Sequence, residues 1–150
     1  MDVCFELVRL RTGGIGAKGK EMISLFLTDL DTRMRGERIH ILLSPLVYHS
    51  GLLNRSIIIP AGFETDLASV PRLPIIYALW GDRAHREAVL HDYLYRIDSD
   101  PVVSKDVVDK VFLEAMQSRG AAWWIRYPMY YGVCAGGIGS YHKRRVTSSI

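Results

Sequence analysis

The stretch TDLASVPRLPIIYALWGDRAHREAVLHDYLY, residues 65–95, separates two kinds of sequence pattern. Before it, short alternating and β-branched runs predict strands, and after it apolar residues recur at helical spacing. Asp82 is a suitable N-cap for a helix that runs to about Arg96. Strands followed by helices indicate an α+β fold: a small, mostly antiparallel sheet from the N-terminal half, packed against three to four helices from the C-terminal half.

Working outward toward the N-terminus, short segments have strand character. They are residues 5–11, 22–30 (a strand or a short helix), 38–43, 46–48 and 56–59. In residues 38–43 the predicted buried face is Ile39, Ile41 and Leu43, because alternate residues of a strand share a face. Pro45 interrupts this run, and Pro60 ends the last one.

Working toward the C-terminus, the pattern predicts further helices. Residues 74–80 suit a short helix that begins near a proline. Ser104 is placed to cap a later helix that Gly120 ends. The apolar stripe of that helix is Val108, Val111, Phe112, Ala115 and Met116. A last apolar segment covers residues 121–135, and Pro128 is expected to kink or interrupt it.

Size and composition predict one folded domain over residues 1–150. Hydrophobic residues make up 49% of the chain and charged residues 23%, as in ordinary globular proteins. Two cysteines favour a reducing compartment over a disulfide framework. The N-terminus lacks the pattern of a secretory signal. The apolar run 127–141 is shorter than the roughly 20 residues of a membrane span, so we expect a soluble domain.

Charge is unevenly placed along the chain. Residues 115–150 contain five basic side chains and no acidic one, and residues 142–150 form a basic tail. Such a segment suits an anionic partner, although a solvated tail is the plainer interpretation.

Near the other end, the glycine-rich turn 13–19 matches GxGxxG. Glu21 follows it where a phosphate loop needs Ser or Thr, which favours a flexible hairpin loop.

The helix around His91 carries the first candidate site residues. Helical spacing places Ala84, Ala88, His91 and Tyr95 on one face, so His91 must find a hydrogen-bond partner in an apolar setting. One interpretation is a core histidine with satisfied hydrogen bonds. The other makes His91 a general base or metal ligand, with Asp92 as co-ligand or orienting carboxylate.

The loop after residue 64 carries the second set. Asp66 offers a carboxylate and Arg72 an anion-binding guanidinium, whereas ordinary turn chemistry accounts for Asp66 and Ser69 equally well. If this loop meets the His91 helix, the catalytic candidates are His91, Asp92 and Asp66. The substrate-binding candidates are Arg72, Ser69, Thr65 and Tyr95.

A metal ion is the one cofactor that these residues suggest. Asp66, His91 and Asp109 are the candidate ligands for a divalent ion, zinc or similar. For Asp109, a surface ion pair with Lys105 at i−4 is the favoured alternative.

Aromatic residues are dense in the last third of the chain. They are Trp123, Trp124, Tyr127, Tyr130, Tyr131 and Tyr141. Together with Arg126 and the basic tail they suit a membrane interface or a single-stranded nucleic acid. Core packing and a protein–protein surface are the favoured interpretations.

Two long motifs resemble a known family. Residues 59–72 (IPAGFETDLASVPR) and 88–95 (AVLHDYLY), with 45–48 (PLVY) and 108–116 (VDKVFLEAM), are similar to domain of unknown function family 1353. The likeness covers roughly residues 25–135 and implies an origin in tailed bacteriophages or prophages, without a settled activity. Lys105 departs from the arginine usual in that family, and residues 1–24 form an extension outside its pattern.

Two functions from different classes are consistent with these features. The first is a virion (tail-associated) or accessory structural protein with a buried Asp/His network, which binds other phage virion or tail proteins through its C-terminal third. It would occupy the host cytoplasm during infection and then the virion. The second is a small metal-assisted hydrolase that acts on a cell-wall or nucleotide substrate through Asp66, His91 and Asp92.

Overall fold

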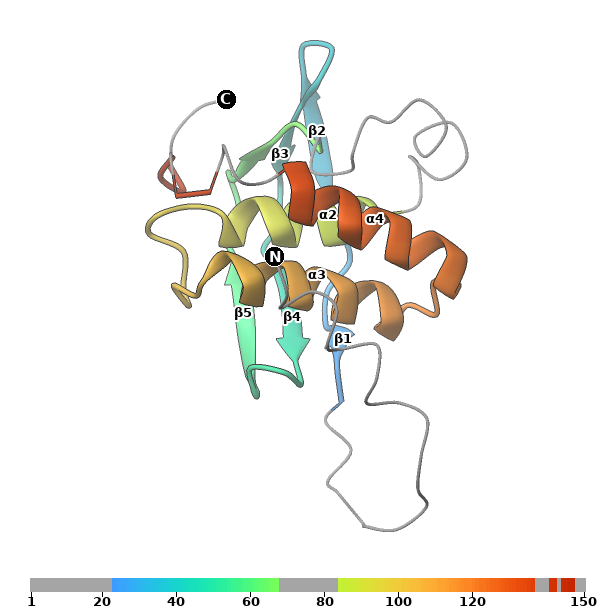
Figure 1. Cartoon of the computed structure of the whole chain (residues 1–150). Coiled ribbons are helices and arrows are strands. Elements are labelled where there is room, and N and C mark those ends of the chain that lie inside the picture. Colours follow the sequence, from blue (N-terminus) through green and yellow to red (C-terminus); the bar gives the residue numbers. More distant parts are fainter. Residues whose placement is uncertain (1–22, 68–83, 137–140, 143, 148–150) are drawn as a thin grey trace, which may run out of the picture.

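The computed structural model describes residues 23–67, 84–136, 141–142 and 144–147. Its elements, in chain order, are β1 (Leu25–Phe26), β2 (Thr32–Arg35), β3 (Ile39–Leu42), β4 (Leu46–Ser50), β5 (Arg55–Ile59), β6 (Glu64–Thr65), α2 (His85–Leu94), α3 (Lys105–Ser118) and α4 (Trp123–Gly136). Strands precede helices, which confirms the α+β prediction. In Figure 1 the three helices lie across the strands.

Several predictions fall outside the described residues. These are the strand at 5–11, the glycine-rich turn 13–19 and the helix at 74–80. Asp82 also lies outside them, but the prediction that it caps the next helix was wrong, because α2 begins at His85 with Ala84 as its N-cap.

The first sheet has the strand order β1-β4-β5, and both pairs are antiparallel. Along β4, Leu46, Tyr48 and Ser50 are buried and the residues between them are only partly so. This alternation follows from the two-residue period of a strand with one face on the core. Helix α3 packs against β1 and β4 from that side.

The second sheet has the order β2-β3-β6, and here the sequence prediction was partly wrong. Leu42 is the buried residue of β3, whereas Leu43 is 50% exposed and lies beyond the strand. Only the end of β3 near Leu42 reaches the core, because the β2–β3 hairpin projects away from the helices (Figure 1). The segments 39–42 and 46–50 also belong to different sheets, so Pro45 separates two strands instead of interrupting one.

The helices agree closely with the sequence pattern. Ser104 is the N-cap of α3, and Gly120, with φ of +74°, follows its end. Every member of the predicted α3 stripe is buried. Pro128 does not interrupt α4, which continues through it to Gly136. None of the helices in the described ranges has the length and apolar character to cross a bilayer.

Candidate functional site

Helices α2 and α3 meet at a buried cluster around His91. His91 Nε2 donates to Asp109 Oδ1 at 3.0 Å, and the Tyr95 hydroxyl donates to the same oxygen at 3.0 Å. The rings of His91 and Tyr95 lie 4.1 Å apart, with Phe112 edge-on to His91 at 5.4 Å. His91 is 3% exposed and Asp109 is 1% exposed, so their polar atoms need hydrogen-bond partners within the protein.

Lys105 completes this cluster from the first turn of α3. Its Nζ donates to Asp109 Oδ2 at 2.7 Å and to the Cys134 carbonyl of α4 at 2.9 Å. The predicted i−4 pair is confirmed, but it is not a surface pair, because Asp109 is buried. One ammonium group therefore links α3 to α4 as well as neutralising a carboxylate.

The charges of this cluster follow from burial and pairing. Burial lowers the pKa of His91, although Asp109 acts in the opposite direction. Burial works to raise the pKa of Asp109, but hydrogen bonds from His91 and Lys105 outweigh it, and the pKa is lowered. The cluster thus favours a neutral imidazole that donates from Nε2 to an ionised carboxylate. His91 Nδ1 is buried and makes no hydrogen bond to the described residues.

A second cluster joins β6 to the other side of α2. Thr65 Oγ1 donates to Asp92 Oδ2 at 2.5 Å and accepts a hydrogen bond from the Leu67 amide at 3.0 Å. Arg96 Nη2 donates to the Glu64 carbonyl at 3.1 Å. Thr65, the first residue of the predicted loop, therefore contacts α2, whereas residues 68–72 of that loop lie outside the described residues.

Asp92 is the most perturbed acid of this second cluster. Burial raises its pKa to about 7. The hydrogen bond from Thr65 lowers the pKa, the negative charge of Asp66 raises it, and the positive charges of Arg96 and Arg144 lower it. Two carboxyl groups near each other, one of which is neutral at pH 6, are suited to proton transfer.

The structure therefore divides the predicted site between two clusters. Asp92, Thr65 and Asp66 belong to the β6–α2 cluster, and His91, Tyr95 and Asp109 to the α2–α3 cluster. Within the described ranges, no three His, Cys, Asp or Glu side chains lie where they could hold a metal ion. Asp66, His91 and Asp109 are thus not assembled as a ligand set. Ser69 and Arg72 lie outside the described residues.

Sequence reasoning missed a third polar cluster, centred on Glu114 of α3. Its Oε1 accepts from Ser24 Oγ at 2.8 Å and from the Leu52 amide at 2.6 Å. Its Oε2 accepts from Ser50 Oγ at 2.7 Å and the Tyr48 hydroxyl at 3.1 Å. Burial, followed by the charge of Glu114, raises the pKa of Tyr48. The only signal in the sequence was an acidic residue bordering the apolar α3 stripe.

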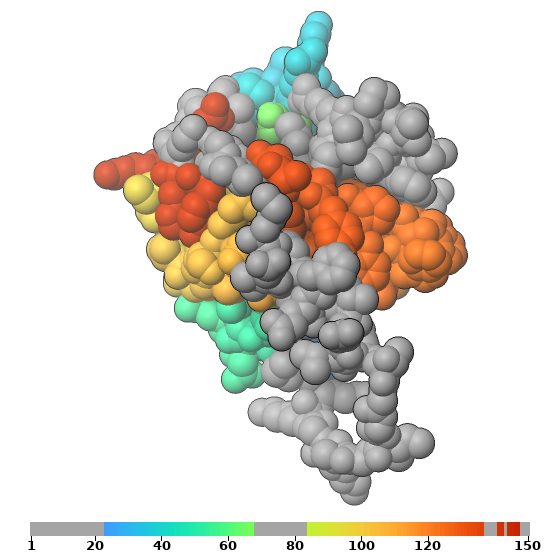
Figure 2. Space-filling view, in the orientation of Figure 1, coloured from blue at the N-terminus to red at the C-terminus, as the bar shows by residue number. Residues whose placement is uncertain are grey.

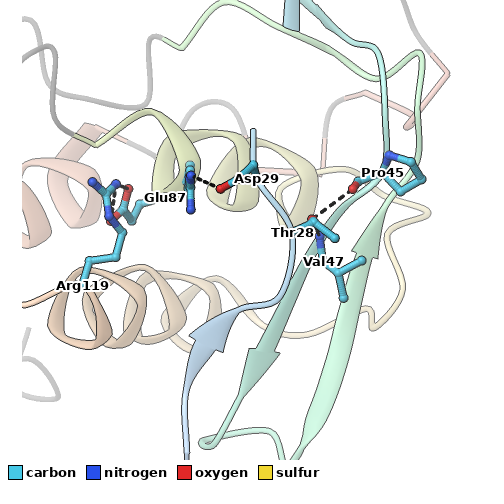
Figure 3. Close-up of polar contacts among 7 residues, drawn as sticks. Thr28, Asp29, Pro45, Val47, Glu87 and Arg119 are labelled. Atoms are coloured by element: carbon cyan, nitrogen blue, oxygen red, sulfur yellow. Dashed lines mark hydrogen bonds and ion pairs between the residues drawn. The ribbon is translucent and has the colours of Figure 1, made fainter. Parts of the chain in front are cut away.

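Further polar contacts connect the helices to each other and to the segment between β1 and β2 (Figure 3). Arg119 Nη1 lies 2.9 Å from Oε2 of the buried Glu87, which joins the end of α3 to α2. Burial raises the pKa of Glu87, and the charge of Arg119 opposes this. Arg86 reaches Asp29 at 2.7 Å on the exposed side of the same helix.

Comparison with known proteins gives one match. The model of a family described as "Protein of unknown function (DUF1353)" matches residues 40–133, which is more than half of the chain and contains the residues at the centres of the three polar clusters, His91, Asp109, Asp92 and Glu114. Searches of curated proteins and of solved structures gave no match. The chain belongs to the DUF1353 family of proteins of unknown function.

Proposed function

We propose that this protein is a tailed-bacteriophage component, either a tail-associated virion protein or an accessory structural protein. The observation that carries the structural role is the His91–Asp109 pair, held by Tyr95 and Lys105 in the interior. A catalytic base must reach a substrate, whereas this imidazole is packed between Tyr95 and Phe112. The phage setting rests on the resemblance of the two central motifs.

The other polar clusters support the same role. Glu114 accepts four hydrogen bonds from β4, the β4–β5 turn and the segment before β1, and Glu87 pairs with Arg119 between two helices. Each cluster joins elements distant in the chain, and buried polar networks of this kind rigidify a core. A rigid domain suits assembly with other virion or tail proteins, for which the basic C-terminal third is the proposed contact region.

Mass spectrometry of purified virions tests this proposal. The protein is expected in particles of its phage at a fixed ratio to a known tail protein, or in stalled assembly intermediates. A gene deletion should lower the yield of complete particles. Absence from particles and intermediates, with normal particle yield after deletion, would show that the proposal is wrong.

A second candidate function rests on Asp92 alone. A carboxyl group with a pKa of about 7, next to Asp66, is suited to act as a general acid or base in a small hydrolase. Cell-wall fragments and nucleotides are the substrates to assay, with and without added divalent metal. An activity with a midpoint near pH 7 that Asp92→Asn abolishes and His91→Phe retains would favour the hydrolase. Activity that survives Asp92→Asn would count against it.

A further inference from the structure

The last described residues of the chain lie beside the C-terminal end of helix α2. Tyr141, His142 and residues 144–147 make up this segment, which we call the C-terminal cover. In Figure 2 the cover (red) lies against the loop between α2 and α3 (yellow) at the surface of the molecule. The family match ends at residue 133, so the cover is outside the matched part of the chain.

Hydrogen bonds attach the cover to α2 and to the loop that follows it. They run from the His142 amide to the Tyr95 carbonyl (2.8 Å), from the Ile97 amide to the Arg144 carbonyl (2.9 Å), from the Val146 amide to Asp98 Oδ1 (2.7 Å) and from the Tyr141 hydroxyl to the Val103 carbonyl. Carbonyl groups at the C-terminal end of a helix have no partner within the helix. The cover therefore caps α2.

The cover also packs on a ring of the α2–α3 cluster. The Tyr141 ring meets the Tyr95 ring edge to face at 5.4 Å. Tyr95 in turn lies 4.1 Å from the His91 ring and donates to Asp109. Tyr141 and Val146 are partly buried and pack against the same core as Tyr95. The rings of Tyr141 and Tyr95 thus stand between the surface and His91.

The closed position of the cover leaves two histidine nitrogens unsatisfied. His91 Nδ1 and His142 Nε2 are buried, and neither makes a hydrogen bond to the described residues. His142 also has a φ of +56°, which is uncommon for a residue with a side chain. A buried nitrogen without a partner costs free energy that contact with water restores. Opening therefore relieves costs at His91 and His142 while it breaks the hydrogen bonds of the cover.

We propose that the C-terminal cover controls access to His91. When the cover leaves α2, the imidazole meets solvent and small solutes while α2 and α3 stay folded. A terminal segment held by one helix end and one loop opens at a lower free energy than the whole domain unfolds. In the closed state His91 serves only the core, and in the open state its Nδ1 can accept a hydrogen bond from a solute. Purified protein tests this inference, so its failure leaves the virion proposal untouched.

Chemical modification of histidine measures the access. Diethyl pyrocarbonate reacts with accessible neutral imidazoles, and mass spectrometry after digestion locates each product. Tyr141→Ala/Asp98→Ala removes the ring packed on Tyr95 and the carboxylate that holds the end of the cover. In this variant His91 should react at least about tenfold faster at pH 7 than in the unaltered protein, because the open state is more populated. His49, partly exposed on β4, is the internal reference and should react at an unchanged rate.

A matched control removes the same two residue types elsewhere. Tyr131→Ala/Asp100→Ala deletes an exposed ring of α4 and a carboxylate of the α2–α3 loop that pairs with Arg55. Because neither side chain touches the cover in the described contacts, the rate at His91 should stay within about twofold of the unaltered protein. A folded cover variant whose His91 reacts no faster than that of this control would overturn the proposal.

A second measurement uses the unaltered protein and does not depend on the folding of a variant. The reaction rate of His91 is followed at urea concentrations below the unfolding transition. Opening of the cover exposes little surface, so the rate should depend weakly on urea, as should hydrogen exchange at the His142 and Val146 amides. A rate at His91 that rises with urea as steeply as global unfolding does would show that the imidazole is reached only when the domain unfolds, and the proposal would be wrong.

Discussion

His91 and Asp92 are neighbours in the chain but have different partners. Successive residues of an α-helix point about 100° apart, so His91 reaches Asp109 on α3 while Asp92 reaches Thr65 on β6. One interpretation of the sequence joined the two in a reactive unit, and the other made His91 a core histidine. At the residue scale they are better described as two contacts that hold α2 from two sides.

Replacing His91 tests the α2–α3 contact. His91→Ala leaves a cavity and removes one donor from buried Asp109, so the free energy of unfolding should fall by about 2–4 kcal/mol. Urea unfolding at pH 7 measures the change. His49→Ala, at a partly exposed residue of β4, is the control and should change stability by less than about 0.5 kcal/mol. Equal effects of the two substitutions would contradict the structural role of His91.

The raised pKa of Asp92 makes stability depend on pH. Because the folded-state pKa is about 7 and the ordinary value is 3.8, folding favours the neutral carboxyl group. This contribution is complete below pH 3.8 and is lost as the pH rises toward 7. Asp92→Asn stays neutral, so its free energy of unfolding relative to the unmodified protein should increase between pH 4 and pH 7. If the difference in free energy of unfolding between the two proteins does not change from pH 4 to pH 7, the raised pKa of Asp92 is wrong.

At the scale of elements, carboxylates of α2 and α3 hold the fold together. The apolar stripe of α3 could be predicted residue by residue, because a 3.6-residue period is visible in the chain. Strand β2 could not be predicted in this way, because its sequence Thr-Arg-Met-Arg does not alternate between apolar and polar residues with a buried face. It is a strand because its backbone pairs with β3. The contacts of Glu114 were equally hidden, because its donors lie 62 to 90 residues away.

Removing the Glu114 carboxylate should release α3 from the β4–β5 turn. Glu114→Ala leaves four donors without their acceptor and is expected to destabilise the protein by roughly 2–4 kcal/mol. Hydrogen exchange at the Leu52 amide, which donates to Oε1 at 2.6 Å, should accelerate well before global unfolding. Glu114→Gln keeps one acceptor oxygen and should have a smaller effect. Unchanged protection of Leu52 in the Ala variant would show that the contact is not needed.

The Glu87–Arg119 pair gives a prediction of a different form. Arg119→Ala leaves the buried carboxyl group of Glu87 without its cation, which is more harmful than removing both partners. In thermal unfolding at pH 7, Arg119→Ala should therefore have a lower melting temperature than the double variant Glu87→Gln/Arg119→Ala. The gap between the two melting temperatures should narrow as the pH is lowered, because the raised pKa of Glu87 lets this carboxyl group take up a proton at a higher pH than an ordinary glutamate does. A higher melting temperature for Arg119→Ala than for the double variant would mean that the Glu87–Arg119 pair contributes little to stability.

At the scale of the whole molecule, the class of fold and the contact between the start of the loop, at Thr65, and α2 were accessible from the sequence. Strand patterns before residue 65 and helical ones after it gave the α+β architecture. The local pair of Lys105 with Asp109 was accessible, but the partners between distant segments were not. Thr65 lies against Asp92, whereas the neighbouring histidine turns toward α3. Which side of a helix meets which neighbour depends on packing between distant segments, and a single sequence carries little information about it.

The division of the strands into two small sheets determines which strand edges are open to pairing with another molecule. Among the described strands, β1 and β6 are sheet edges of two residues each, too short to template another chain, and the β2 edge carries Arg33 and Arg35. The remaining edge, β5, has five residues with Ile58 pointing into water. If concentrated protein were to form intermolecular β-structure, β5 is the strand where that pairing would begin.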